Sequence, residues 1–207
     1  MSEAGEAGEA GEEAGGGGPH PGVPVAGGAD PGGAHPGVPD LLGPDLRVLF
    51  CGINPGLVSA AKAQHFARPG NRFWKVLHLA GFTPALLGPD DQEALPGLGI
   101  GITNLVARPS AAASELQRAE LREGAGRLAA MAAVVRPAHV AVLGALAYRS
   151  AFARPAATVG PQPDDLGGAR LWVLPNPSGL QASYQLPEMV ELYGRLAAAA
   201  GYPAAGP

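Results

Sequence analysis

The chain of 207 residues contains one cysteine, no long apolar stretch and, over its first 40 residues, no Lys, Arg, Phe, Trp or Tyr. A single thiol, Cys51, excludes an intramolecular disulfide and a metal site built from several cysteines. Because Cys51 lies in an apolar run, we expect a buried, unreactive thiol. No apolar stretch reaches the roughly 18 residues of a membrane span, and the N-terminus lacks the basic and apolar segments of a secretory signal. We therefore expect a cytoplasmic protein with no membrane contact.

The N-terminal part of the chain has an unusual composition. Residues 1–40 contain 13 glycines, 6 prolines and seven acidic residues. Such a segment buries too little apolar surface to offset the entropy of ordering, and its repeats, EAGEAGEAGEEAG and HPGVP, are too short for a solenoid. We predict a disordered acidic arm over 1–40 and one folded domain over 41–203. Residues 41–207 carry 14 basic and 11 acidic residues, a balance that permits nucleic-acid binding without requiring it.

Strands and helices are predicted to alternate after the arm. Short apolar runs that end in turn residues indicate strands at 46–51, 100–106, 139–143 and 171–174. Helices are expected at 72–80 with Asn71 as N-cap, from a capping box at Ser114 and Gln117 to Val135, at 145–152 and at 187–199. A loop is expected at 154–168. This alternation predicts an α/β fold, a three-layer α/β/α sandwich around a mostly parallel central sheet. Ligands bind such sheets at the carboxyl ends of the strands.

Two loops at those strand ends are candidates for a site. The first, GINPG at 52–56, combines turn residues with Asn54, whose carboxamide hydrogen-bonds but is not a strong base. It is not a Walker loop, because no Gly-Lys-Ser/Thr follows. The second, NPSGL at 176–180, ends in an apolar side chain suited to a wedge in a base stack. Each loop taken alone also fits an ordinary structural turn.

Together the motifs resemble a known family. LRVLFCGINPGLVSAAKAQHFARPGNRFWKVLHLAGF at 46–82, GIGITNLVARPS at 99–110 and WVLPNPSGL at 172–180 resemble the mismatch-specific uracil and thymine DNA glycosylases of the uracil-DNA glycosylase superfamily. The resemblance spans roughly 41–200 and leaves out the arm. It implies a monofunctional hydrolase that flips and excises uracil from G·U mispairs, or thymine from G·T mispairs, and initiates base excision repair. No cofactor and no metal are expected; the expected partner is double-stranded DNA with mispaired or damaged bases, bound by a nucleoid-associated monomer.

The resemblance also implies roles for residues of the substrate pocket. Asn54 would position the attacking water, Phe66 would stack on the flipped base, and Ser59 would lie near the C5 edge of the pyrimidine. Backbone N–H groups of the GINPG loop would stabilise the departing base. Because no carboxylate accompanies Asn54, we expect slow turnover. The substrate site would be completed by Gly52, Ile53 and Asn104.

The resemblance further implies that the NPSGL loop contacts DNA. Leu180 would be the wedge, and backbone groups around Gly179 and Gln181 would meet the widowed guanine, with Asn176 and Ser178 completing the loop. Gln181-Ala182 stands where the bacterial branch has Ser-Arg, so a cation directed at phosphate or guanine is missing. Asn104 replaces the lysine of some bacterial relatives and is similar to the thymine-DNA glycosylase branch.

Other functions and roles remain open at this point. The chain is alternatively a lesion-binding protein with weak catalysis, or an α/β domain that binds a nucleotide or phosphate through GINPG. Within the enzyme class, thymine, hypoxanthine and etheno-adducts are alternative targets. His65 is expected to be a solvent-facing loop residue, and Arg68, Arg72 and Arg108 to be solvated surface charges or phosphate contacts.

Overall fold

A five-stranded sheet lies at the centre of the computed structural model, which describes residues 37–180 and 182–203. The strand order is β2-β1-β3-β5-β4. Three pairings are parallel and only the last is antiparallel. The strands are β1 (Val48–Gly52), β2 (Ile100–Asn104), β3 (His139–Leu143), β4 (Gly160–Leu166) and β5 (Ala169–Leu174). The expected disordered arm, except for residues 37–40, lies outside the described residues.

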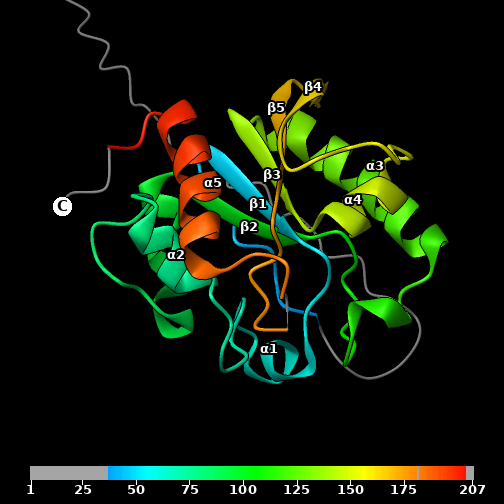
Figure 1. Ribbon diagram of the computed structural model, residues 1–207, viewed down its shortest axis with the longest axis horizontal. Coiled ribbons are helices and arrows are strands. Elements are labelled where there is room, and N and C mark those ends of the chain that lie inside the picture. Colours follow the sequence, from blue (N-terminus) through cyan, green and yellow to red (C-terminus); the bar gives the residue numbers. More distant parts are fainter. Residues whose placement is uncertain (1–36, 181, 204–207) are drawn as a thin grey trace, which may run out of the picture. The chain divides into compact units, whose positions relative to one another are not determined.

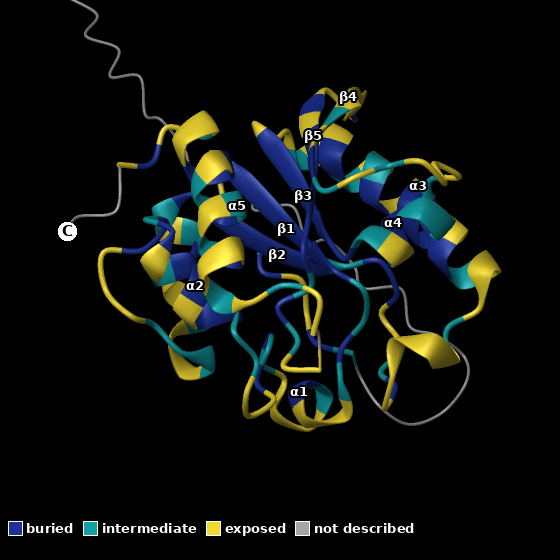
Figure 2. Ribbon diagram, in the orientation of Figure 1, coloured by how far each residue is buried: buried dark blue, intermediate teal, exposed yellow. Residues whose placement is uncertain are grey.

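Helices cover both faces of this sheet, because alternate strand residues enter two separate cores. In β1, Val48 and Phe50 belong to one apolar cluster, and Leu49 and Cys51 to the other. The first face is covered by α2 (Phe73–Leu79) and α5 (Leu186–Ala199), the second by α3 (Arg118–Val135) and α4 (Ala145–Ala151), as Figure 1 shows. Buried strands lie between helices whose outer surfaces are exposed (Figure 2). The predicted three-layer α/β/α sandwich is confirmed.

Cys51 is fully buried, as expected, and desolvation raises the pKa of its thiol far above the usual range. Such a thiol stays protonated and unreactive at neutral pH. None of the helices in the described part of the chain is long and apolar enough to cross a membrane.

Two elements were not predicted: one lies in the expected loop at 154–168, and the other lies in a segment for which no element was predicted. β4 occupies the Gly/Pro/Asp-rich stretch, where Pro161 and Pro163 argue against a strand. An edge strand tolerates proline, because the outward side of its backbone needs no ladder partner. The second element, α1 (Leu57–Lys62), has six residues and follows the GINPG loop directly. It is too short to show a helical pattern in the sequence.

The starts of two helices show how local side chains set the boundaries. The N-cap of α2 is Arg72, one residue after the predicted Asn71, although Asn71 Oδ1 accepts the backbone N–H of Phe73 at 2.9 Å. The capping box at Ser114 and Gln117 was wrong by one turn. Gln117 is itself the capping position of α3, and its backbone N–H donates to Glu120 Oε2 at 2.8 Å. Ser114 lies in a preceding single turn of 3-10 helix (Ala113–Glu115).

Candidate active site

A pocket of about 340 Å³ opens at the carboxyl edge of the sheet. It is lined by residues that follow β1, β2, β3 and β5, and it lies where β1 is flanked by β2 on one side and β3 on the other. This is the switch point where ligands of open α/β sheets bind, and the volume suits a small organic group. The predicted site residues that line it are Gly52, Ile53, Asn54, Ser59, Phe66, Asn104, Asn176, Ser178 and Leu180. Gly179 is in the loop but does not line the pocket, and Gln181 lies outside the described residues.

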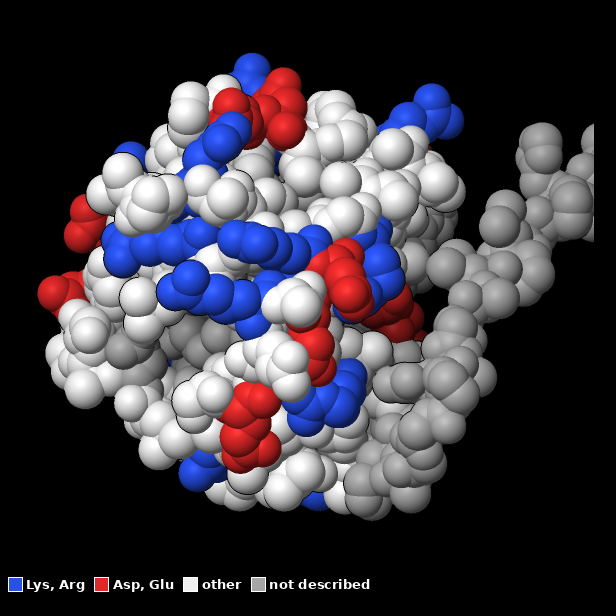
Figure 3. All heavy atoms as spheres, turned by 90° about the vertical axis from the view of Figure 1, so that its right-hand side faces the viewer, with Lys and Arg blue, Asp and Glu red and all other residues white. Residues whose placement is uncertain are grey.

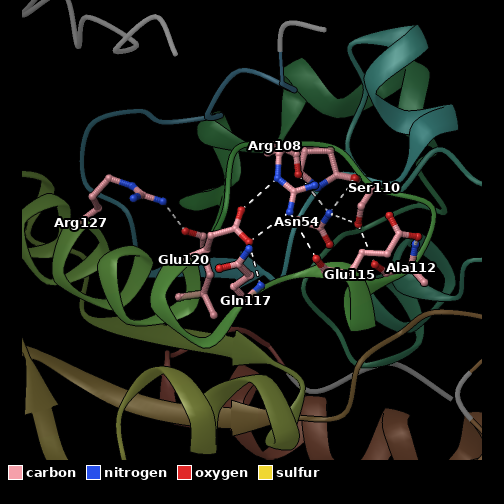
Figure 4. Close-up of polar contacts among 10 residues, drawn as sticks. Asn54, Arg108, Ser110, Ala112, Glu115, Gln117, Glu120 and Arg127 are labelled. Atoms are coloured by element: carbon pink, nitrogen blue, oxygen red, sulfur yellow. Dashed lines mark hydrogen bonds and ion pairs between the residues drawn. The ribbon is translucent and has the colours of Figure 1, made fainter. Parts of the chain in front are cut away.

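The carboxamide of Asn54 is held in one orientation. Its Nδ2 donates to Ser110 Oγ at 2.8 Å, to the Arg108 carbonyl at 3.1 Å and to the Pro55 carbonyl at 3.3 Å (Figure 4). Backbone carbonyls only accept hydrogen bonds, so the nitrogen must face them. Because all three contacts use Nδ2, Oδ1 remains to accept a hydrogen bond from a ligand or water in the pocket. Ser110 uses its own proton to donate to the Ala112 carbonyl at 2.8 Å.

Arg108 and Ser110 are positioned by a network that continues into α3 (Figure 4). The Arg108 guanidinium makes two hydrogen bonds to Glu120, at 3.0 and 3.1 Å. These bonds, with the Gln117 backbone N–H, lower the pKa of Glu120. An ion pair this exposed adds little stability, so its main effect is on the geometry of the segment that supports Asn54. Arg108 is therefore ion-paired at this site, and its carbonyl is the group that contacts Asn54.

The floor of the pocket requires a glycine at the end of β1. Gly52 is paired in register with Asn104 of β2. A Cβ on Gly52 would lie 2.5 Å from Asn104 Oδ1 and 3.6 Å from Phe66 Cζ. Any larger residue would displace the Asn104 carboxamide from the pocket. The glycine therefore brings a second carboxamide close to the GINPG backbone.

Phe66 and Ser59 form a further wall. The Phe66 ring stacks on Phe73 with centroids 3.9 Å apart, which fixes its plane. Its backbone has φ 54°, a left-handed conformation that costs a residue with a side chain on the order of 1 kcal/mol or more. Ser59 is buried on α1, and its Oγ accepts the Ala67 backbone N–H at 3.1 Å. Both side chains line the pocket at fixed positions.

His65 is buried, which corrects the expectation of a solvent-facing loop residue. It is 3% exposed, and its Nε2 lies 2.9 Å from the Pro39 carbonyl. The carbonyl can only accept, so Nε2 carries the ring proton. Desolvation lowers the pKa of His65 to about 4, leaving the ring neutral at pH 7. Among the described residues, no Asp or Glu lines the pocket. Apart from Arg68, the hydrogen-bonding side chains described in the pocket are therefore neutral, and none of them is a carboxylate base.

The NPSGL loop is tied to the body of the domain. The Arg72 backbone N–H donates to the Pro177 carbonyl at 2.9 Å, and its guanidinium donates to the carbonyls of Ser178 at 3.0 Å and Tyr184 at 2.8 Å. Arg72 therefore has a structural role and is not a solvated surface charge. A Cβ on Gly179 would lie 2.6 Å from the Gly70 carbonyl, so the loop also packs closely on the segment before α2.

At the end of this anchored loop, Leu180 is 71% exposed although it is a large apolar side chain. It lines the mouth of the pocket together with the exposed Arg68. On the side of α3 and α4, Lys and Arg side chains also gather in a band across the surface (Figure 3). Positive charge at these places suits an anionic partner such as a phosphate backbone. In the described parts of the chain, no group of three or more His, Cys, Asp or Glu could bind a metal.

The fold has a solved counterpart. A solution NMR structure of a Methanosarcina acetivorans protein, provisionally assigned as a uracil DNA glycosylase, is similar with a TM-score of 0.54 and 20% sequence identity. The similarity covers 78% of this chain and 98% of that one. At this identity the match shows a shared fold.

The family follows from the sequence model of the uracil DNA glycosylase superfamily, which matches residues 39–197. The chain belongs to this superfamily. Its members are DNA glycosylases, hydrolases that remove uracil from DNA in DNA repair.

Proposed function

We propose that the chain is a mismatch-specific DNA glycosylase that flips uracil out of G·U mispairs in duplex DNA and hydrolyses its N-glycosidic bond. The observation that carries the proposal is the fixed carboxamide of Asn54, whose Nδ2 contacts three acceptors in a pocket with no described carboxylate. The free Oδ1 is suited to hold a water beside the anomeric carbon. Thymine in G·T mispairs, hypoxanthine and etheno-adducts are the alternative targets within the same chemistry.

The proposed chemistry depends on orientation. Cleavage develops positive charge on the sugar, as in other oxocarbenium-like reactions, and negative charge on the departing base. Asn54 would align the water without deprotonating it strongly, and alignment alone contributes a large effective concentration. Backbone N–H groups of the loop from Gly52 to Gly56 would stabilise the anionic base. The neutral His65 supplies no second charge, so turnover is expected to be slow.

The proposed selectivity begins with opening the base pair. Extruding a nucleotide costs a few kcal/mol, and less for a mispaired base. Leu180 would fill the vacated position in the stack, as apolar wedges do in other DNA-bending proteins. Phe66 would stack on the flipped base, and Ser59 would crowd a C5 methyl. These roles are supported by two observations: Ser59, Phe66 and Leu180 line the same pocket, and the side chain of Leu180 is exposed.

A panel of duplexes tests this function. Enzyme in excess is mixed with duplexes that carry uracil opposite guanine, uracil opposite adenine, thymine, hypoxanthine or ethenocytosine opposite guanine, and with single-stranded uracil DNA. We expect the fastest base release from G·U. Equal rates on G·U, A·U and single strands would refute mismatch specificity. Tight binding to G·U without base release would favour the lesion-binding alternative.

Asn54→Ala is the companion test. It should bind a G·U duplex within a few-fold of wild type, because Asn54 is a half-buried loop residue with no role in the core. Its single-turnover excision should fall by roughly two or more orders of magnitude, the scale for losing one preorganised group. Anisotropy gives the affinity and product release gives the rate. Excision at a near wild-type rate would show that Asn54 does not position the water.

A further inference from the structure

The pocket lining includes one residue of the segment at 37–41, which we call the strap. Val38 of the strap is 8% exposed and lines the pocket, whereas the next two residues, Pro39 and Asp40, are partly open to solvent. Leu41 is buried in the core cluster beside α2. Residues 37–40 were expected to belong to the arm, because a valine among glycines and prolines carries no sequence signal for a pocket residue.

Three polar contacts hold the strap in place. His65 Nε2 donates to the Pro39 carbonyl at 2.9 Å. Thr103 Oγ1, on β2, donates to Asp40 Oδ1 at 2.6 Å. Leu41 exchanges two backbone hydrogen bonds with Ile102, each at 2.8 Å. The strap also packs closely against the chain at Gly37, since a Cβ at this position would lie 2.5 Å from the Ala107 carbonyl oxygen.

The anchors connect the strap to both sides of the pocket. His65 lines the pocket itself and follows α1, whereas Thr103 precedes Asn104 at the end of β2. Val38 directly precedes the two anchored residues, Pro39 and Asp40. Val38 is itself buried and is followed by residues held by part-buried hydrogen bonds, so a larger ligand would have to displace Val38 and strain these bonds.

We propose that Val38 is a specificity-determining residue, and that its side-chain volume limits the size of the base that enters the pocket. The inference rests on the proposed base excision and adds a residue of the strap to the pocket. One methyl or methylene in a tight pocket changes discrimination by roughly 10–200-fold. Val38→Ala removes two methyl groups from the wall, and Val38→Ile adds one.

The test is the ratio of single-turnover excision rates from G·T and G·U duplexes of the same sequence. Val38→Ala should raise the thymine-to-uracil ratio roughly tenfold, and Val38→Ile should lower it. The matched control is Val76→Ala, the same change at a fully buried valine of α2 that does not line the pocket. The control reports what a cavity in the core does, and its ratio should equal that of wild type. If Val38→Ala and Val76→Ala give the same ratio, the strap is only a scaffold.

The anchors provide a second variant. Thr103→Val removes the hydroxyl that donates to Asp40 and keeps the size of the side chain. A loosened wall should raise the thymine-to-uracil ratio in the same direction as Val38→Ala and by less. If the ratio is unchanged in Thr103→Val but raised in Val38→Ala, then Val38 limits the size of the base, but the hydrogen bond from Thr103 to Asp40 does not contribute to this limit.

A binding readout separates this inference from the proposed activity. Affinities for duplexes with the non-cleavable 2′-fluoro analogues of deoxyuridine and thymidine opposite guanine are measured by anisotropy. If wild type releases no base, the proposed function fails, and the effect of Val38→Ala on the ratio of these two affinities still decides the role of Val38. If wild type excises uracil and Val38→Ala changes neither ratio, only the role of Val38 is refuted.

Discussion

Acidification should unfold this protein in part by protonating His65. The folded-state pKa of His65 is about 4, against 6.5 for the free side chain, because the ring is 3% exposed. Between these two values the unfolded chain binds the proton and the folded protein does not. The stability due to the neutral ring is therefore complete above pH 6.5 and is lost as the pH falls toward 4. At about 1.36 kcal/mol per pKa unit, the loss is about 3 kcal/mol by pH 4.

The measurement is the free energy of unfolding by urea at several pH values between 7 and 4. A loss of this size is a large share of the total stability of a typical domain, which is about 5–15 kcal/mol. His65→Gln keeps a donor for the Pro39 carbonyl and does not titrate. Between pH 7 and pH 4 this variant should therefore lose about 3 kcal/mol less unfolding free energy than wild type. His65→Asn also does not titrate and is too short to reach Pro39. It should show the same flattened pH dependence at a lower stability throughout.

The slope of unfolding free energy against pH decides the matter. If His65→Gln loses stability with acid as steeply as wild type, another group causes the loss, and the prediction that the His65 ring is buried in its neutral form is refuted. Because His65 holds the strap, excision should also decline over the same pH range in wild type. A decline that is identical in His65→Gln would refute that connection.

Further predictions concern the pocket, the wedge and the arm. Ser59→Ala should raise the thymine-to-uracil excision ratio by removing the hydroxyl near the C5 edge, and an unchanged ratio would exclude Ser59 from selectivity. Leu180→Ala should slow excision from duplexes more than from single strands, whereas equal losses would indicate a misfolded loop. Ser110→Ala should slow excision roughly two- to tenfold at unchanged affinity, the scale of one hydrogen bond; a weaker affinity with an unchanged rate would contradict its role in orienting the carboxamide. The fragment 37–207 should excise uracil at the full rate, with slightly tighter DNA binding after loss of six acidic residues. The fragment 41–207 lacks most of the strap and should be slower and less selective; equal rates for the two fragments would show that the strap is dispensable.

Much of the fold could be predicted because its strands and long helices have strong local signals. The parallel strands are continuous apolar runs, and α3 and α5 show clear helical patterns. The positions of the two motif loops followed from the same pattern, because parallel strands place their carboxyl ends at one edge. β4 did not follow, since its prolines obscure a strand that only its edge position permits.

The parts of the site that were missed depend on contacts between distant segments. The role of Ser110 in orienting Asn54 could not be predicted, because the two residues meet only in the fold and lie 56 positions apart in the sequence. The burial of His65 could not be predicted, because Pro39, which it contacts, lies 26 residues earlier in the sequence. Arg72 was predicted to be a surface charge because the groups that accept its hydrogen bonds are backbone carbonyls more than 100 residues away. Backbone carbonyls have no sequence signature.

The attachment of the NPSGL loop to Arg72 has a consequence for how the protein searches along DNA. A loop held to the domain through its own carbonyls would meet the DNA with its shape already set, so most of the deformation would fall on the DNA. If Leu180 is the wedge that we propose, recognition would then depend on the stacking strength of the local base pairs. A lesion in a flexible pyrimidine–purine context should be found and opened sooner than the same lesion in a stiff A-tract. The flanking sequence would thereby change the repair rate through its stiffness alone.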